Sequence, residues 1–147
     1  MKRVVVTGMG CVTPVGNDPE TMFKNLCDGK SGLKLIDDTY VPYIKPAVVG
    51  EPDYTPPTKI TGADTIVYYV VEAARQAIAD AKLDPRGDDT GVYIGNGAGG
   101  VDTIEAGYRA VILKEKKLNP LTILGMMSSS TASAISIEMG ITGPVFA

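Results

Sequence analysis

The sequence of 147 residues contains no histidine and no tryptophan. Without histidine, the chain can form neither a Ser-His-Asp or Cys-His catalytic group nor a His-ligated metal site. Its two cysteines, Cys11 and Cys27, are too few for a disulfide framework and form no C-x-x-C motif. A free cysteine is usually a small buried hydrophobe, so we expect both to be buried and inert. We therefore predict no metal and no cofactor in this chain.

The sequence also lacks an excess of positive charge and a long apolar run. A net charge of −3 argues against nucleic acid or an anionic membrane as a partner. No apolar run approaches the roughly 20 residues of a transmembrane helix. The valines behind the N-terminal basic pair are too few for a signal-peptide core. With ordinary hydrophobic and charged contents of 44% and 21%, the composition predicts a cytoplasmic globular domain.

Apolar spacing and capping residues predict a strand and a helix at the start of the chain. The β-branched run at residues 3–8 is typical of a buried strand in a parallel sheet. Residues 15–29 follow as a helix that stops at Gly29. Asn17 is its predicted N-cap, and Glu20 completes a capping box. The core face of this helix is expected to consist of Met22, Phe23 and Leu26.

The clearest helix is predicted over residues 63–84. Its apolar residues recur at helical spacing and are mostly small, so this helix should pack closely against a neighbour. They are Val67, Val70, Val71, Ala74, Ala77 and Ala81. Before this helix, the proline-rich residues 37–62 are expected to be irregular, with a candidate edge strand at residues 47–50.

The second half of the chain continues the alternation of strands and helices. A short strand is predicted over residues 90–95, followed by a helix over residues 101–117 with a solvated "KEKK" end. The latter part of residues 120–140 should form a tightly packed helix that stops at Gly140. Another strand begins within residues 143–147. This order, without an internal repeat, predicts an α/β fold.

The glycine-rich loop "GNGAGG" has two interpretations. Gly95, Gly97 and Gly100 match the G-x-G-x-x-G pattern of a dinucleotide-binding loop, and the acidic Glu115 follows at a suitable distance. That pattern normally opens the first strand–helix unit of a domain, and here it comes late in the chain. The other interpretation is a turn whose glycines let the backbone approach a neighbouring element. Both remain open on the pattern alone.

Several segments together carry a family resemblance. "RVVVTGMGCVTPVGND" at the N-terminus, Ser31 and Gly32, "GVYIGNGAGG" and "SAISIEMGITGP" occur in one order over essentially the whole chain. On these segments, the chain resembles the N-terminal part of the elongating β-ketoacyl-acyl-carrier-protein synthases of the thiolase superfamily. The resemblance implies a thiolase-like layered α/β fold. Residues 1–147 would form its N-terminal half as one domain, which is incomplete without a C-terminal remainder.

The resemblance also implies a reaction and its partners. Such synthases catalyse a decarboxylative Claisen condensation of an acyl thioester with malonyl-acyl-carrier protein, in fatty-acid or polyketide elongation, and usually form dimers. Neither cysteine of this chain matches the family's nucleophile motif. The nucleophile is expected about five residues beyond Ala147, at a helix N-terminus that lowers its pKa. The catalytic histidines would lie further on. The chain would therefore hold no catalytic residue and would be inactive alone.

What the resemblance leaves to this chain is the acyl pocket. Its predicted lining residues are Gly97, Ala98, Gly99, Met126 and Met127. Ala98 stands where the elongating enzymes often have an isoleucine that closes the tunnel. Met126 and Met127 lie in a segment that lines the pocket of a dimer partner, which could be a second copy or a different chain. The family commonly has a basic residue and an Asp-Arg pair before the long helix. Lys59 and Asp64 match the basic residue and the aspartate, but Thr65 replaces the arginine.

Two other functions remain open. The first is a non-catalytic subunit of the chain-length-factor type, which shapes the acyl pocket of a partner. The identity of the residue at the nucleophile position separates this function from that of an enzyme. The second is a dinucleotide-binding domain that uses the "GNGAGG" loop, which predicts saturable binding of NAD.

Overall fold

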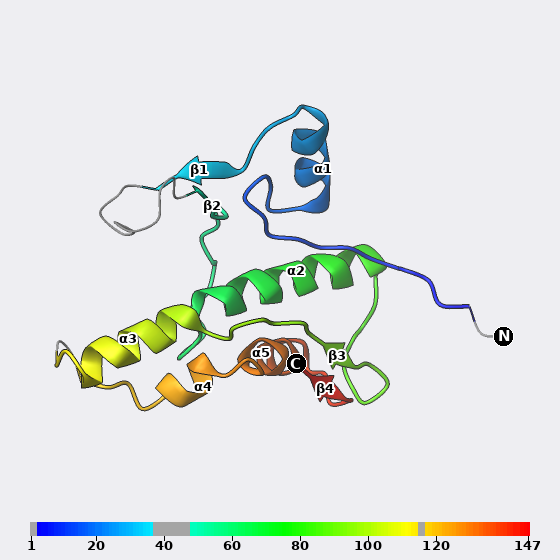
Figure 1. Cartoon of the computed structure of the whole chain (residues 1–147). Helices are drawn as coiled ribbons and strands as arrows, with labels where there is room; N and C mark the ends of the chain where they lie inside the picture. The colour runs from blue at the N-terminus through cyan, green and yellow to red at the C-terminus, as the bar shows by residue number, and fades with distance from the viewer. Residues whose placement is uncertain (1–2, 37–47, 115–116) are drawn as a thin grey trace.

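The computed structural model describes residues 3–36, 48–114 and 117–147 (Figure 1). In chain order, the elements are α1 (Pro19–Cys27), β1 (Leu33–Leu35), β2 (Val48–Gly50), α2 (Thr65–Ala81), β3 (Val92–Tyr93), α3 (Val101–Val111), α4 (Thr122–Met126), α5 (Ser130–Met139) and β4 (Val145–Phe146). Within the described ranges, no helix is both long enough and apolar enough to cross a bilayer.

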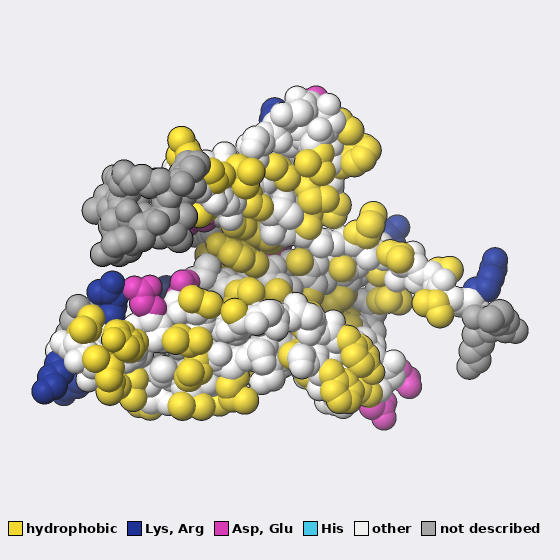
Figure 2. Space-filling model, viewed as in Figure 1, with side chains coloured by type: hydrophobic (Ala, Val, Ile, Leu, Met, Phe, Trp, Pro, Cys, Tyr) yellow, Lys and Arg dark blue, Asp and Glu magenta, His cyan; other side chains and the backbone are white. Residues whose placement is uncertain are grey.

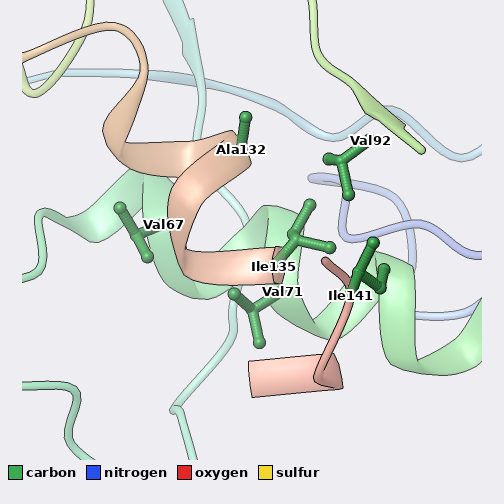
Figure 3. Packing of buried hydrophobic residues seen from close by; sticks show 6 residues of the cluster. All are labelled: Val67, Val71, Val92, Ala132, Ile135 and Ile141. Atoms are coloured by element: carbon green, nitrogen blue, oxygen red, sulfur yellow. The ribbon is translucent and has the colours of Figure 1, made fainter. Parts of the chain in front are cut away.

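The core lies between α2 and α5, with β3 and β4 at one end of α5. Six buried hydrophobic residues form it, and Figure 3 shows their side chains gathered from α2, α5, β3 and the segment before β4. They are Val67, Val71, Val92, Ala132, Ile135 and Ile141. Val67 and Val71 belong to the predicted small stripe, and Val70 and Ala74 flank the core. The prediction of a closely packed helix is confirmed, although the helix is shorter than residues 63–84.

Among the described residues there are two small sheets, each of two strands. β3 and β4 are parallel, with Val92 opposite Val145, and the connection between them contains α3, α4 and α5. The predicted strands within residues 90–95 and 143–147 are therefore confirmed. β1 and β2 are antiparallel, with Leu33 opposite Gly50. The candidate edge strand at residues 47–50 is confirmed for its described part, which begins at Val48. β1 was not predicted.

The predicted strand at residues 3–8 is wrong. This segment pairs with no strand of the described chain, and Val4 and Val6 are 97% and 81% exposed. The chain continues instead along α2 (Figure 1), where the backbone N–H of Met9 donates to Asp80 Oδ2 at 3.0 Å. A β-branched run favours extended backbone. Whether that backbone becomes a buried strand depends on a partner strand, which the local sequence does not specify.

The N-terminal segment approaches α2 at two glycines. A Cβ atom on Gly8 would lie 2.1 Å from the carbonyl oxygen of Ala77, and one on Gly10 would lie 2.0 Å from that of Ala73. Only glycine fits at such a distance from a helix backbone. Directly after Gly10, the backbone N–H of Cys11 donates to Gln76 Oε1 at 3.1 Å. The small residues of α2 therefore admit both α5 and the N-terminal segment.

Two predictions for α1 are wrong. The N-cap is Asp18, whose Oδ1 accepts the backbone N–H of Thr21 at 2.8 Å, because the helix starts one residue later than expected. Asn17 instead donates from Nδ2 to the carbonyl oxygen of Asp53. The expected core face is not buried either, since no residue of α1 is buried. Of the predicted core residues Met22, Phe23 and Leu26, the last two are 69% and 54% exposed.

The remaining helices agree more closely with the predictions. α5 is the tightly packed helix, and it stops at Gly140, whose φ of +68° is in the left-handed region. α3 starts at the predicted residue 101 but ends at Val111, so it is shorter than residues 101–117. Residues 115 and 116 of the predicted solvated end lie outside the described residues. The short helix α4 was not predicted.

Candidate functional site

The candidate site lies where the loop at residues 95–100 meets the segment at residues 125–129. Asn96 folds this loop: its Oδ1 accepts the backbone N–H groups of Ala98 and Gly99 at 3.3 and 3.2 Å. Its Nδ2 donates to the carbonyl oxygen of Ser128 at 3.4 Å, across to the other segment. A single side chain thus shapes the loop and joins it to the residues that follow α4.

The loop and α4 are in direct backbone contact. Gly99 has a φ of +71°, and a Cβ atom on it would lie 2.5 Å from the carbonyl oxygen of Met126. A Cβ atom on the buried Gly100 would lie 2.1 Å from the carbonyl oxygen of Gly125. The N–H of Gly100 also donates to the Met126 carbonyl oxygen at 3.4 Å. The glycines are therefore required for close packing at this point.

Asp64 joins the start of two helices beside this contact. It is the N-cap of α2, where its Oδ1 accepts the backbone N–H of Ile66 at 3.3 Å, and it is only 5% exposed. Its Oδ2 accepts the backbone N–H of Thr103, in the first turn of α3, at 2.8 Å. A carboxylate is stabilised at both places because the free N–H groups and the dipole of a helix N-terminus favour negative charge.

This arrangement decides between the two interpretations of the glycine loop. In a dinucleotide site, the pyrophosphate would bind at the N-terminus of the helix after the loop, here α3. The Asp64 carboxylate already occupies that N-terminus, and a second anion there would be repelled. Close packing, and not phosphate binding, accounts for Gly99 and Gly100. Glu115, the proposed acidic partner, lies outside the described residues.

A mostly apolar cavity of about 260 Å³ lies between α2, α4 and α5. Its lining residues are Ile60, Thr61, Gly62, Ala63, Val67, Leu124, Met127, Ser129, Ser130, Ser133, Ala134, Ile137 and Glu138. Ser130 Oγ is buried from solvent and has no hydrogen-bond partner. The apolar side chains of the lining can contact an apolar group.

The predicted pocket residues lie near one another but do not line one cavity. Met127 lines this cavity and is 48% exposed. Met126 is half-buried and contacts Gly99 through its carbonyl oxygen. Gly97 and Ala98 are exposed, and neither lines the cavity. Sequence reasoning matched Asp64 to a family position but missed its role as a bridge, although an aspartate directly before an apolar helical pattern is an N-cap signal.

The two cysteines differ in their surroundings. Cys11 is half-buried, and this burial, together with the nearby Asp18 carboxylate, raises the pKa of its thiol. A raised pKa disfavours the nucleophilic thiolate at neutral pH. Cys27 is exposed at the end of α1, so the prediction that it is buried is wrong. Among the described residues, no group of three or more Cys, Asp or Glu side chains could hold a metal ion.

Comparison with known families and proteins gives a consistent result. The family model described as "Beta-ketoacyl synthase, N-terminal domain" matches residues 1–147. The chain is 31% identical over 153 aligned positions to 3-oxoacyl-[acyl-carrier-protein] synthase 2 of Staphylococcus aureus (strain COL), and 33% identical over 153 positions to the synthase of the same name from Vibrio harveyi. Each alignment covers 97% of this chain but only 37% of the relative.

Solved structures of ketosynthases have the same fold. A β-ketoacyl synthase from Burkholderia phymatum superposes with a TM-score of 0.80 at 25% identity, covering 97% of this chain and 38% of that one. The ishigamide ketosynthase/chain length factor superposes with a TM-score of 0.84 at 22% identity, covering 99% of this chain and 39% of that one. The expectation of a thiolase-like layered α/β fold, present here in part, is confirmed.

Proposed function

Because the chain belongs to the family of β-ketoacyl synthase N-terminal domains, we propose that it is the N-terminal domain of a 3-oxoacyl-acyl-carrier-protein synthase. That synthase would condense an acyl thioester with malonyl-acyl-carrier protein in fatty-acid or polyketide elongation. The single observation that carries the proposal is the family match over residues 1–147. The synthase relatives named above, aligned over nearly all of this chain, support it.

The proposal assigns the chemistry to residues outside this chain. In the proposed reaction, a cysteine thiolate attacks the acyl thioester and the carrier thiol leaves. The malonyl group then loses CO₂, and the resulting carbanion attacks the acyl-enzyme and releases the cysteine. This chain has no histidine, and Cys11 has a raised thiol pKa in half-buried surroundings. It spans 37% of the relatives' length, so we propose that the remaining residues supply the nucleophile and its histidines.

The role proposed for this chain is to hold the acyl group. The cavity beside Met127 is open to solvent and lined mainly by apolar side chains, which would contact a bound hydrocarbon. Methionine suits such a site because its flexible thioether adapts to chains of different length. We place Gly97, Ala98, Gly99 and Met126 in the same acyl-binding region, with the glycine loop as one wall. Within this region, Met127 would contact the acyl chain of a dimer partner.

The exposed apolar surface supports a larger assembly. Large hydrophobic side chains are exposed on several elements (Figure 2), among them Tyr93 and Phe146, which stack at 5.5 Å between ring centroids on the small parallel sheet. Ile137 on α5 is 78% exposed. Large apolar side chains that are exposed together on a domain usually mark a surface that another protein surface covers. We propose that the remainder of the synthase and a dimer partner cover Tyr93, Phe146 and Ile137, in a cytoplasmic protein that receives its substrates from acyl carrier protein.

A non-catalytic subunit of the chain-length-factor type is the second candidate function. Ala98 and Thr65, which depart from the residues common in the elongating enzymes, favour it over a standard fatty-acid synthase. The two functions differ in one residue, the occupant of the nucleophile position. Mass spectrometry of the assembled synthase after incubation with an acyl thioester distinguishes them. By assembled synthase we mean this chain together with the residues that complete it. A covalent acyl group supports the enzyme, and its absence supports the second function.

The acyl-binding role is tested by Ala98→Ile in the assembled synthase. The larger side chain should fill the pocket wall and reduce acylation by long-chain thioesters roughly tenfold or more, since each displaced CH₂ contact is worth about 0.8 kcal/mol. Acylation by short-chain thioesters should change little. Ala79→Ile makes the same change at an exposed position of α2 and serves as the control. Identical chain-length profiles for Ala98→Ile and the unmodified synthase would contradict the proposed role.

A further inference from the structure

We propose that Asp64 is a positioning residue that sets the acyl-chain selectivity of the synthase by fixing the glycine loop against α4. The effect on acyl-chain selectivity rests on the proposed function, whereas the contacts of Asp64 are present in this chain. Asp64 touches no residue of the glycine loop by a hydrogen bond. It acts through the first turn of α3, into which that loop leads.

Asp64 forms a polar connection between α2 and α3. Its two carboxylate oxygens accept the backbone N–H of Ile66 in α2 and the backbone N–H of Thr103 in α3. Thr103 is 39 residues from Asp64 along the chain. Because Asp64 is only 5% exposed, water has little access to replace these two hydrogen bonds. A buried acceptor shared between two charge-assisted hydrogen bonds holds both donors more firmly than a neutral cap would.

The start of α3 is packed against both Asp64 and α4. Gly100, the residue before α3, lies against Asp64 on one side, where a Cβ atom would be 2.9 Å from that side chain. The same Cβ atom would also lie 2.1 Å from the Gly125 carbonyl oxygen. Gly125 in turn lies against the backbone of Gly62, two residues before Asp64. These contacts close a ring of segments with Asp64 as its charged member.

This ring of segments is in contact with the candidate acyl site. Gly99 and Gly100 share the Met126 carbonyl oxygen as their neighbour, and the next residue is the cavity-lining Met127. A displacement of α3 therefore changes the distance between Ala98 on the loop and Met127 at the cavity. Because displacements near 1 Å can change rates by up to about 100-fold, a loose ring should alter which acyl chains fit.

The test separates capping from bridging. Asp64→Ser keeps an acceptor for α2, since serine is a good N-cap, but its hydroxyl is too short to reach Thr103 as well. Asp64→Asn keeps the shape and loses one acceptor, and it guards against a Ser variant that fails to fold. Asp18→Ser is the matched control, because Asp18 caps only α1.

Two quantities are measured in the assembled synthase. Amide hydrogen exchange at residues 99–103 should accelerate roughly tenfold or more in both Asp64 variants, because a hydrogen bond to a charged group is lost. The ratio of long-chain to short-chain acylation rates should change at least about threefold, whereas a merely destabilised synthase would lose both rates in proportion. Asp18→Ser should leave both quantities unchanged.

The outcomes divide clearly. Faster exchange with a changed ratio supports the proposal. Unchanged exchange, or faster exchange with an unchanged ratio, overturns it, as does an equal change in the Asp18→Ser control. If the unmodified synthase accepts no acyl group, the proposed function fails and the selectivity role of Asp64 fails with it. Exchange at residues 99–103 then still decides whether Asp64 fixes the loop.

Discussion

The inner and outer regions of the molecule are held together in different ways. The inner region comprises α2, α5, β3 and β4 with the loop and helices between them, and it contains all six buried hydrophobic residues of the described chain. The outer region comprises α1, β1 and β2, within residues 11–36 and 48–60, and contains no buried residue. It is attached to α2 through polar contacts, such as Gln76 Nε2 donating to the Asn17 carbonyl oxygen at 2.6 Å.

This difference indicates where positional accuracy resides. In the inner region, backbone contacts at glycines and a packed core define distances to within a fraction of an ångström. In the outer region, side-chain hydrogen bonds exchange with water and contribute about 1 kcal/mol each. A pocket that measures acyl length needs the first kind of support, and the candidate acyl site lies in the inner region. Three substitutions can break or sharpen this contrast.

The largest effect is expected from Gly100→Ala in the inner region. The new Cβ atom would lie 2.1 Å from the Gly125 carbonyl oxygen, a backbone atom that cannot rotate away. We expect a loss of about 3 kcal/mol in the free energy of unfolding of the assembled synthase, at the upper end for overpacking. Gly95→Ala is the control, because nothing lies within 4 Å of its Cβ position. A loss below about 1 kcal/mol for Gly100→Ala, measured by denaturant unfolding, would contradict the close packing.

The next effect compares truncations in the two regions. Val71→Ala removes part of a side chain that is 2% exposed and should cost about 2 kcal/mol, from lost burial and the cavity left behind. Phe23→Ala removes a larger side chain that is 69% exposed and should cost less than about 1 kcal/mol. Unfolding of both variants would be measured under the same conditions. A larger loss for Phe23→Ala would show that α1 is covered by another part of the assembled synthase.

The smallest effect is a pH dependence confined to the outer region. The backbone N–H of Thr21, and then its hydroxyl, lowers the pKa of the Asp18 carboxyl. A lowered pKa in the folded state means that the cap stabilises α1 above the unfolded-state pKa. This stabilisation is lost as the pH falls through the folded-state pKa, below about pH 4. Hydrogen exchange at the start of α1, corrected for intrinsic rates, should rise there. Asp18→Asn should abolish this rise, and acid fraying that persists in this variant would exclude Asp18 as its cause.

Sequence patterns predicted the inner region better than the outer one. In α2, the stripe containing Val67 and Val71 repeats at helical spacing, so the helix was predictable. The end of α5 at Gly140 was also predictable, because glycine readily adopts the left-handed conformation that ends a helix. The candidate N-cap residues Asn17 and Asp18 are adjacent and chemically alike, and only the observed start of α1 shows that Asp18 is the cap. The bridge from Asp64 to Thr103 depends on tertiary structure, which no local pattern contains. The family motifs supplied the site, since composition and spacing alone left the glycine loop ambiguous.

The contact of the N-terminal segment with α2 also limits how this protein can change during evolution. Gly8 and Gly10 already have the smallest side chains available, and the atoms that they meet include the backbone oxygens of Ala77 and Ala73. A larger residue at either glycine therefore has no compensating substitution on the helix, because no side-chain change removes a backbone oxygen. In a saturation library of the assembled synthase, these two positions should accept only glycine, and no second-site suppressors on α2 should be recovered.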